Sequence, residues 1–263
     1  MDVKVRRQLR PGEAKLAKNV WENIRLGHPQ VWPYAKQLTP VCLCAGGPYL
    51  SDHIPEIRRL QVSGSEVVCV GNAGATLISY DIKPNGHVIL DGAERNKSFV
   101  TPSRDTRYFV ASQCDPSVFK ALENHRHVYI WHACSTPEDK FNLDEWYGKG
   151  KWIPIGSGSY ITLRSIGLLN VLGYQYIYVY GLDSCLHEDS HHAYSQPNAD
   201  GQEVHTISIN GTKFRCNAWM VDQAKQFVDC IKKGTFGDAE LAVKGDGMIA
   251  TIIREGALNG RDS

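Results

Sequence analysis

The sequence lacks the features that mark membrane, secreted and nucleic-acid-binding proteins. None of its apolar runs is long enough to cross a bilayer, and residues 1–7 contain no apolar signal core. The formal net charge is only +1, which argues against a general surface for nucleic acid or anionic membranes. We therefore expect a cytoplasmic protein with no membrane span and no nucleic-acid partner.

The cysteines lack the spacing of a metal-binding ribbon. Eight are present, but no two of them form a C-x-x-C pair. Several lie inside apolar runs, as Cys42 and Cys69 do. Buried free thiols are therefore expected, instead of disulfides or structural zinc.

Two common nucleotide-binding signatures are also missing. The small-residue loop at residues 156–159 lacks the Lys-Ser/Thr pair of a Walker A loop, and Ile161 breaks the G-x-G-x-x-G pattern. Nucleotide hydrolases and classical dehydrogenases therefore lose support. The loop can still wrap an anion with its backbone amides, which makes Gly158 and Ser159 candidate contacts.

One metal-binding motif matches the sequence but lacks the helix that it requires. Residues 187–191 match the H-E-x-x-H pattern of zinc proteases, which requires a helix to bring both histidines to one face. Asp189 and Ser190 are poor helix formers, and the segment directly follows a predicted strand. We therefore assign no metal ligand here.

The chain is long and apolar enough for a substantial core. It has 263 residues, of which 42% are hydrophobic and 22% charged, so disorder is not expected. These values fit one large α/β domain, here residues 39–255, with an N-terminal helical segment at residues 1–38 and a tail at residues 256–263. Apolar residues at four-residue steps predict an amphipathic packing helix over residues 11–25.

Residues 155–194 show most clearly how the domain is built. A loop of small residues is followed by a helical pattern over residues 160–172, with Gly173 at the usual position of a C-terminal cap. The β-branched and aromatic residues 176–180 then predict a buried strand. Asp183 follows this strand and is succeeded by a polar, histidine-rich loop.

The other predicted strands also end at glycine or polar residues. We expect strands at residues 39–45, 65–71, 87–92, 108–111 and 127–131. The first three end at Gly46-Gly47-Pro48, Asn72 and Asp91. Ligands of open α/β sheets bind outside the carboxyl ends of the strands. The pattern therefore predicts a Rossmann-like α/β fold with a mainly parallel sheet flanked by helices, and one crevice lined by residues 46–51, Asn72, Asp91, residues 156–159 and Asp183.

The remaining segments predict a smaller elaboration and a lid. Asn210-Gly211 indicates a hairpin between strands at residues 204–208 and 212–216, followed by a helix at residues 218–232. A last strand at residues 240–243 and a helix at residues 248–254 complete the pattern. Residues 134–151 are polar and contain Pro, Gly and one Trp, and we interpret them as a loop or lid over the site.

Each candidate binding residue has a structural alternative. Gly46, Gly47 and Pro48 either let the backbone approach a phosphate or form a plain turn. Asn72 either bonds a base or ribose or caps the next helix. Asp91 either binds a hydroxyl or divalent ion or forms an Asp-Gly turn.

The histidine-rich loop is the candidate for acid–base chemistry. His187, His191 and His192 follow Asp183 closely, and an imidazole near a carboxylate suits a general base because its pKa lies near neutral pH. The alternative is a solvated loop that happens to be rich in histidine.

Taken together, these motifs resemble those of the MptE-like family. That family includes archaeal 6-hydroxymethyl-7,8-dihydropterin diphosphokinase and the motility-associated Maf glycosyltransferases. The order of loops is also similar to that of bacterial CMP-sialic-acid-dependent sialyltransferases. The resemblance covers about residues 20–255, and Tyr49 stands where serine is usual. The matching segments are Trp21-Glu22-Asn23-Ile24, Gly47-Pro48-Tyr49-Leu50, Asn72-Ala73, Pro84 to Asp91, Gly158-Ser159, Leu172-Gly173, Gly181-Leu182-Asp183 and His192-Ala193.

The resemblance implies a nucleotide-dependent transferase. Its substrates are expected to be a nucleotide-activated donor, of CMP type, and a small-molecule or glycan acceptor. In this interpretation His192 is the general base, Asp183 orients the acceptor, and Gly47, Asn72 and Ser159 hold the donor. An ATP-dependent diphosphokinase acting on a hydroxymethylpterin-like alcohol, with Mg²⁺ held in part by Asp91, is the alternative enzyme. A non-catalytic nucleotide-binding module is the alternative outside the enzymes, and the oligomeric state stays open.

Overall fold

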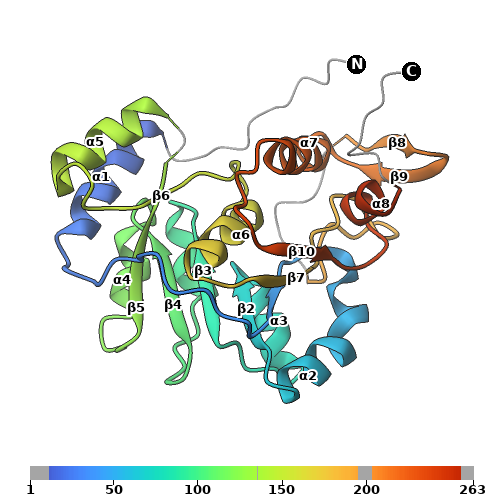
Figure 1. The fold of residues 1–263 in the computed structure, drawn as a ribbon, viewed down its shortest axis with the longest axis horizontal. Coiled ribbons are helices and arrows are strands. Elements are labelled where there is room, and N and C mark those ends of the chain that lie inside the picture. Colours follow the sequence, from blue (N-terminus) through green and yellow to red (C-terminus); the bar gives the residue numbers. More distant parts are fainter. Residues whose placement is uncertain (1–11, 135, 195–202, 256–263) are drawn as a thin grey trace.

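The structure is a computed structural model that describes residues 12–134, 136–194 and 203–255. Its centre is an eight-stranded parallel sheet with the strand order β10-β7-β1-β2-β3-β4-β5-β6 (Figure 1). This confirms the predicted Rossmann-like α/β fold. The strands are β1 (Val41–Cys44), β2 (Glu66–Val70), β3 (Gly86–Ile89), β4 (Arg107–Ala111), β5 (Val128–Ala133), β6 (Pro154–Ile155), β7 (Tyr176–Tyr180) and β10 (Glu240–Val243).

Helices connect the strands and cover both faces of the sheet, as parallel sheets require. The α-helices are α1 (Glu13–Ile24), α2 (Ile54–Val62), α3 (Ala73–Ser79), α4 (Pro116–Ala121), α5 (Pro137–Tyr147), α6 (Ile161–Val171), α7 (Ala218–Lys232) and α8 (Met248–Arg254). Two short 3₁₀ helices are η1 (Pro48–His53) and η2 (Glu94–Phe99).

The core lies on both faces of the sheet because alternate residues of a strand point to opposite sides. All four residues of β1 are buried. Val41 and Leu43 belong to the larger apolar cluster, which includes residues of α6. Cys42 and Cys44 belong to a smaller cluster with residues of η1, α2 and α3. The eight cysteines are free and seven of them are buried, as expected from their apolar surroundings.

The chain reverses its direction of travel across the sheet between β1 and β7. It starts at β1, adds β2 to β6 on one side, and then returns to place β7 on the other side of β1. The strands β1 and β7 are therefore neighbours, but the chain continues from each of them toward opposite sides of the sheet. In open α/β sheets this switch point is where ligands bind.

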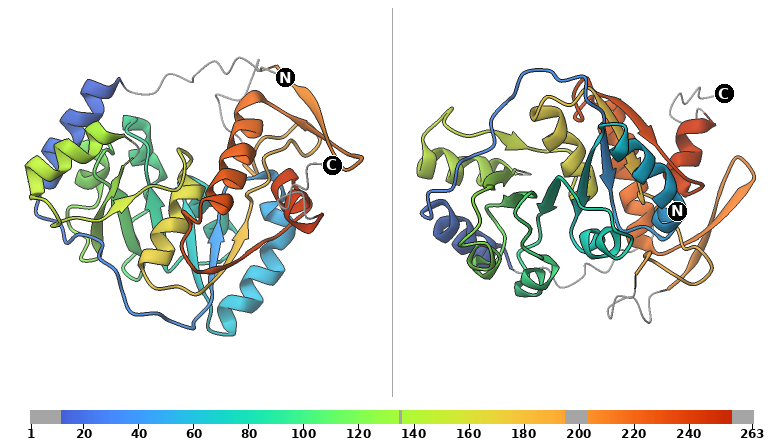
Figure 2. Two further views of the ribbon diagram at one scale, coloured as in Figure 1. Left: turned by 45° about the horizontal axis from the view of Figure 1, so that its top comes forward. Right: turned by 90° about the horizontal axis from the view of Figure 1, so that it is seen from below.

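The predicted hairpin is present and lies beyond the β10 edge of the sheet with α7 and α8 (Figures 1 and 2). Its strands are β8 (His205–Ile209) and β9 (Thr212–Cys216). Asn210 and Gly211 both have positive φ, at 44° and 91°, as a two-residue type I′ turn requires.

The prediction of a loop or lid at residues 134–151 is wrong, because most of this range forms the helix α5 (Pro137–Tyr147). The helix begins with a reciprocal capping box between Thr136 and Asp139, and Pro137 occupies its first turn. Both views place α5 beside α1, at the β5/β6 end of the sheet (Figures 1 and 2), where Trp146 contacts Trp21 with ring centroids 5.8 Å apart. It therefore does not cover the switch point.

The N-terminal helix α1 is attached to the sheet by polar side chains. Its buried residues are Asn19 and Asn23. Asn23 Nδ2 donates to the carbonyls of Ser112 and Cys114 at 2.9 and 2.7 Å. Because these carbonyls follow β4, the helix satisfies polar backbone groups that would otherwise be buried without partners.

Candidate functional site

The loops after β1 and β7 touch each other at the switch point. The Gly47 amide donates to the Gly181 carbonyl at 2.8 Å. A Cβ atom on Gly47 would lie 2.4 Å from that carbonyl oxygen, and one on Gly181, whose φ is +67°, would lie 2.3 Å from the Ala45 carbonyl oxygen. Both positions therefore require glycine, which explains two of the predicted motif residues by close backbone approach.

Asp183 lies beneath this contact and is almost completely buried, with 2% of its surface exposed. Its Oδ2 accepts a hydrogen bond from the Tyr49 amide at 3.0 Å, at the start of η1, next to Pro48, the first residue of that helix. Its Oδ1 is buried and accepts no hydrogen bond from the described residues. Burial raises the pKa of the Asp183 carboxyl to about 7, with a smaller contribution from the charge of Asp52.

Asp183 therefore holds the glycine loop in place through Tyr49. Its two carboxylate oxygens make no hydrogen bond to His192, so the structure forms no aspartate–histidine pair here. The role predicted for Asp183, orienting the acceptor, stays a prediction.

His192 lies on the other side of the same loop. Its Nδ1 is 3.0 Å from the carbonyl oxygen of Gly46, and the amide of Ala193 donates to that same oxygen at 3.1 Å. Because a carbonyl can only accept, Nδ1 carries the proton and Nε2 keeps its lone pair. Burial lowers the pKa of the His192 imidazole, and the neighbouring His191 lowers it further. His192 is therefore neutral at physiological pH, with Nε2 as the basic atom.

Aromatic rings hold the His192 imidazole in position. Tyr194 stacks on it with centroids 5.3 Å apart and planes 9° apart, and Trp219 stacks with centroids 6.2 Å apart. The Tyr194 ring also covers Gly46, where a Cβ atom would lie 2.3 Å from its hydroxyl oxygen. Neither aromatic residue was predicted to belong to the site. Tyr194 ends the histidine-rich loop and Trp219 opens α7, so their position next to predicted elements was the available signal.

Asn72 is the residue directly before α3, the position from which one of the two interpretations had it cap that helix. Its side chain makes no cap hydrogen bond, and we find none to any other described residue. Its carboxamide is partly exposed at the carboxyl end of β2, the strand next to β1. It is therefore free to bond a ligand.

Asp91 follows β3 and is exposed. Its Oδ1 accepts from the amide of Ala93 at 3.3 Å, and its Oδ2 is 3.9 Å from the guanidinium of Arg95. The side chain thus forms the turn that was the structural alternative. β1 and β2 separate its strand from β7, so Asp91 and Asp183 share the carboxyl edge of the sheet without touching.

The loop at residues 156–159 contacts α7. The amide and the hydroxyl of Ser159 both bond Oε1 of Gln226, at 2.8 and 3.0 Å. A Cβ atom on Gly158, whose φ is +80°, would lie 3.0 Å from the same oxygen. The amide and the hydroxyl of Ser159 are therefore already bonded within the protein. The next residue, Tyr160, donates from its hydroxyl to the carbonyl of Trp219, whose ring stacks on His192.

The H-E-x-x-H segment forms a tight turn, as its poor helix formers predicted. His187 and Ser190 exchange backbone hydrogen bonds at 3.1 and 2.9 Å, and Glu188 has a φ of 54°. This turn does not present His187 and His191 on one helical face.

The chain belongs to the MptE-like family. The family model described as 6-hydroxymethylpterin diphosphokinase MptE-like matches residues 15–189, which confirms the resemblance drawn from the motifs. No curated protein sequence matches the chain.

Two of the solved structures that match the chain are transferases. The MAf glycosyltransferase from Magnetospirillum magneticum AMB-1 is 17% identical, with a TM-score of 0.65 over 93% of this chain and 40% of its own length. A mammalian sialyltransferase in complex with Gal-beta-1-3GalNAc-ortho-nitrophenol is 10% identical, with a TM-score of 0.41 over 89% of this chain and 87% of its own. The first comparison shows that the two proteins share a fold. The chain spans 40% of the length of the MAf glycosyltransferase that it matches.

Within the part of the chain that the structure describes, no helix is both long and apolar enough to cross a membrane.

Proposed function

We propose that the protein is a nucleotide-dependent transferase that moves a sugar from a CMP-type donor to an alcohol acceptor. The observation that carries the proposal is the bond between Nδ1 of His192 and the Gly46 carbonyl. It leaves a neutral Nε2 beside the glycine loop at the switch point of the sheet. Family membership and the fold shared with a glycosyltransferase support the same class.

His192 acts as the general base in this proposal. Its Nε2 takes the proton of the acceptor hydroxyl as the acceptor oxygen bonds to the anomeric carbon of the donor sugar. The bond from that carbon to the nucleotide phosphate breaks, and the nucleotide leaves with its electron pair. The stacked rings of Tyr194 and Trp219 keep the imidazole in one orientation, which favours a productive geometry.

The donor is assigned to the neighbouring strand ends. The phosphate is assigned to the loop of Gly46, Gly47 and Pro48, where Tyr194 covers Gly46 and would have to move for the phosphate to reach that residue. The free carboxamide of Asn72 bonds the ribose or the base. Asp183 acts as a positioning residue by holding the Tyr49 amide. Ser159 contacts a donor only if it exchanges its bonds to Gln226 for bonds to the ligand. Gly158, the preceding residue of the same loop, is assigned to the donor with it.

A diphosphokinase is the second candidate, because the matching family model is described by that activity. Its reaction needs the same deprotonation of an alcohol, followed by attack on the β-phosphorus of ATP with AMP as the leaving group. Among the described residues, no group of three or more His, Cys, Asp or Glu side chains could hold a metal ion. Mg²⁺ is commonly bound by one or two carboxylates plus substrate phosphates, so the exposed Asp91 fits it.

A non-catalytic nucleotide-binding module is the third candidate, and one experiment separates all three. Thermal unfolding is measured with CMP, UDP, GDP, ADP and ATP, each with and without Mg²⁺, because a bound nucleotide raises Tm by mass action. A rise with CMP, together with release of CMP from a CMP-sugar in the presence of an acceptor, supports the first proposal. A rise with Mg²⁺-ATP and formation of AMP from a hydroxymethylpterin supports the second. Binding without turnover supports the third, and no rise with any nucleotide contradicts all of them.

A further inference from the structure

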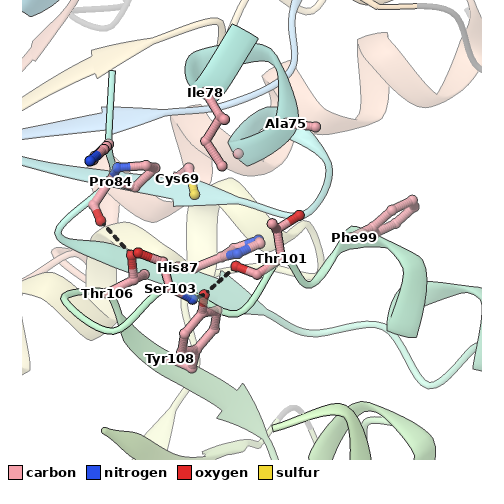
Figure 3. Close-up of a pocket in the computed structure, with 12 residues that line it drawn as sticks. Cys69, Ala75, Ile78, Pro84, His87, Phe99, Thr101, Ser103, Thr106 and Tyr108 are labelled. Atoms are coloured by element: carbon pink, nitrogen blue, oxygen red, sulfur yellow. Dashed lines mark hydrogen bonds between the residues drawn. The ribbon is translucent and has the colours of Figure 1, made fainter. Parts of the chain in front are cut away.

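A second pocket lies on the face of the sheet that carries α3, and we call it the α3 pocket (Figure 3). Its volume is about 180 Å³. It is lined by Cys69, Gly74, Ala75, Ile78, Lys83, Pro84, His87, Phe99, Thr101, Ser103, Thr106 and Tyr108.

The α3 pocket is separate from the candidate site at the switch point. Pro84 and Thr106 precede β3 and β4 and bond each other at 2.8 Å, so they mark the part of the pocket at the amino ends of these strands. The pocket extends from there along α3 to Gly74 and Ala75 in the first turn of that helix. None of the residues assigned to catalysis or donor binding lines the pocket.

His87 supplies an unused hydrogen-bond acceptor in the pocket. Its Nε2 lies 2.7 Å from the carbonyl oxygen of Gly71, so Nε2 carries the proton and Nδ1 keeps a lone pair. No described residue donates a hydrogen bond to Nδ1. Burial lowers the pKa of His87 to about 4, which keeps this acceptor available at neutral pH.

Gly74 leaves the imidazole uncovered on the side of α3. A Cβ atom there would lie 3.4 Å from Cε1 of His87, 3.7 Å from its Nδ1 and 3.1 Å from the sulfur of Cys69. Glycine within a helix costs about 0.5–1 kcal/mol relative to alanine. Any side chain at this position would therefore crowd the opening to the imidazole.

The walls define the chemistry of an occupant. Ile78 and Ala75 lie above the space and Ser103 lies below it in Figure 3, and Ile78 is 42% exposed although it is apolar. Phe99 adds an aromatic wall, and no lining residue carries a carboxylate. The one lysine of the lining, Lys83, is exposed, so the inner walls carry no charge. The pocket thus suits a small, apolar ring, and it offers no carboxylate to a cation.

We propose that the α3 pocket binds a small, planar, neutral aromatic or heteroaromatic compound that donates one N–H or O–H to Nδ1 of His87. The rings of such compounds bury apolar surface against Ile78 and Phe99. The N–H or O–H of the compound bonds an acceptor to which no described residue donates.

Indole tests this proposal, with benzothiophene as its matched control. The two rings are similar in shape, but benzothiophene lacks the N–H group. Binding is followed by titration with NMR on protein labelled with ¹⁵N-histidine. We expect indole to bind about three- to tenfold more tightly than benzothiophene, and to shift the Nδ1 resonance of His87 because a new hydrogen bond forms there.

Two variants of α3 locate the binding site. Ala75 and Ser79 are both exposed on the same helix, but only Ala75 lines the pocket. Ala75→Leu should weaken indole binding by about tenfold or more because the larger side chain fills the space. Ser79→Leu should leave it unchanged. Absence of saturable indole binding, equal affinity for both rings, or unchanged affinity in Ala75→Leu would overturn the proposal.

Discussion

At the scale of single residues, the position of one proton on His192 determines what the ring can do. The Gly46 carbonyl retains the proton on Nδ1, and Nε2 is the atom left for an acceptor. If His192 is the base, His192→Ala should lower kcat by roughly 10²–10⁴-fold. The affinity for nucleotide should change little, because donor binding is assigned to Gly47 and Asn72. Steady-state kinetics and calorimetric titration of the donor nucleotide measure the two quantities.

His191→Ala is the matched control, because His191 is the adjacent histidine of the same loop. It should retain most of the activity. Loss of activity in His191→Ala together with survival in His192→Ala would transfer the role to His191. Full activity in both variants would remove this loop from the chemistry.

The acidity of His192 predicts a pH profile. Its pKa lies below the usual value of 6.5 because the ring is buried, and only the neutral form accepts a proton. As pH falls, kcat should therefore stay constant through 6.5 and decline only at lower pH. A pH–rate profile between pH 5 and 8 measures this limb. A decline centred above 6.5 would contradict the assignment.

Asp183 predicts a pH dependence of folding stability. The folded carboxyl keeps its proton up to about pH 7, whereas an unfolded aspartate releases it near pH 4. Between these values the folded state binds more protons, so ionisation of Asp183 lowers the free energy of unfolding as pH rises. From pH 4 to pH 8 the loss should amount to roughly 3–4 kcal/mol.

Asp183→Asn isolates this contribution because asparagine has nearly the same shape and does not ionise. Urea unfolding of both proteins is measured at several pH values. As pH rises from 4 to 8, the free energy of unfolding of the wild type should fall relative to that of the variant. A difference that is constant across this range would show that Asp183 does not keep its proton.

At the scale of elements, the contact between the loops after β1 and β7 determines the shape of the candidate site. Gly47→Ala would place a Cβ atom 2.4 Å from the Gly181 carbonyl oxygen and 2.3 Å from Oδ2 of Asp183. Because a backbone carbonyl cannot rotate away, we expect a loss of about 1–3 kcal/mol in the free energy of unfolding. Chemical denaturation measures it.

Gly156→Ala is the control for that variant. Gly156 also lies in a loop at the carboxyl edge of the sheet, and a Cβ atom there meets nothing within 4 Å. Its stability should stay within about 0.5 kcal/mol of the wild type, as for ordinary surface changes. Equal stability of Gly47→Ala and Gly156→Ala would contradict the close approach of the two loops.

At the scale of the whole molecule, the balance of charge predicts weak interaction with polyanions. The chain carries 29 basic and 28 acidic residues, so it offers no large excess of cations to release counterions from a nucleic acid. Binding to duplex DNA should be undetectable by fluorescence anisotropy at physiological salt and should gain little at low salt. Submicromolar binding with a steep salt dependence would contradict this.

Many parts of this architecture were predictable because their causes are local. Apolar runs identified β1 and β7, since parallel strands are buried on both faces, and Asn210-Gly211 identified the hairpin through its positive φ angles. The bounds of α7 agreed with the prediction because its apolar face follows the helical period. The α5 helix was missed although its capping box lies in the sequence, because only Leu143 in it is buried and its apolar period is weak.

The sequence alone therefore determined the class of fold, most of the strands and the residues that end them. These depend on periodicity and turn chemistry within short stretches. Only the tertiary structure decided which strand ends meet, because Tyr49 and Asp183 are 134 residues apart and no local preference brings them together. It also decided that Gln226 accepts the hydrogen bonds of Ser159, that aromatic rings stack on His192, and that His87 faces a pocket. Packing between distant segments sets each of these contacts, and the chemistry of the site depends on them.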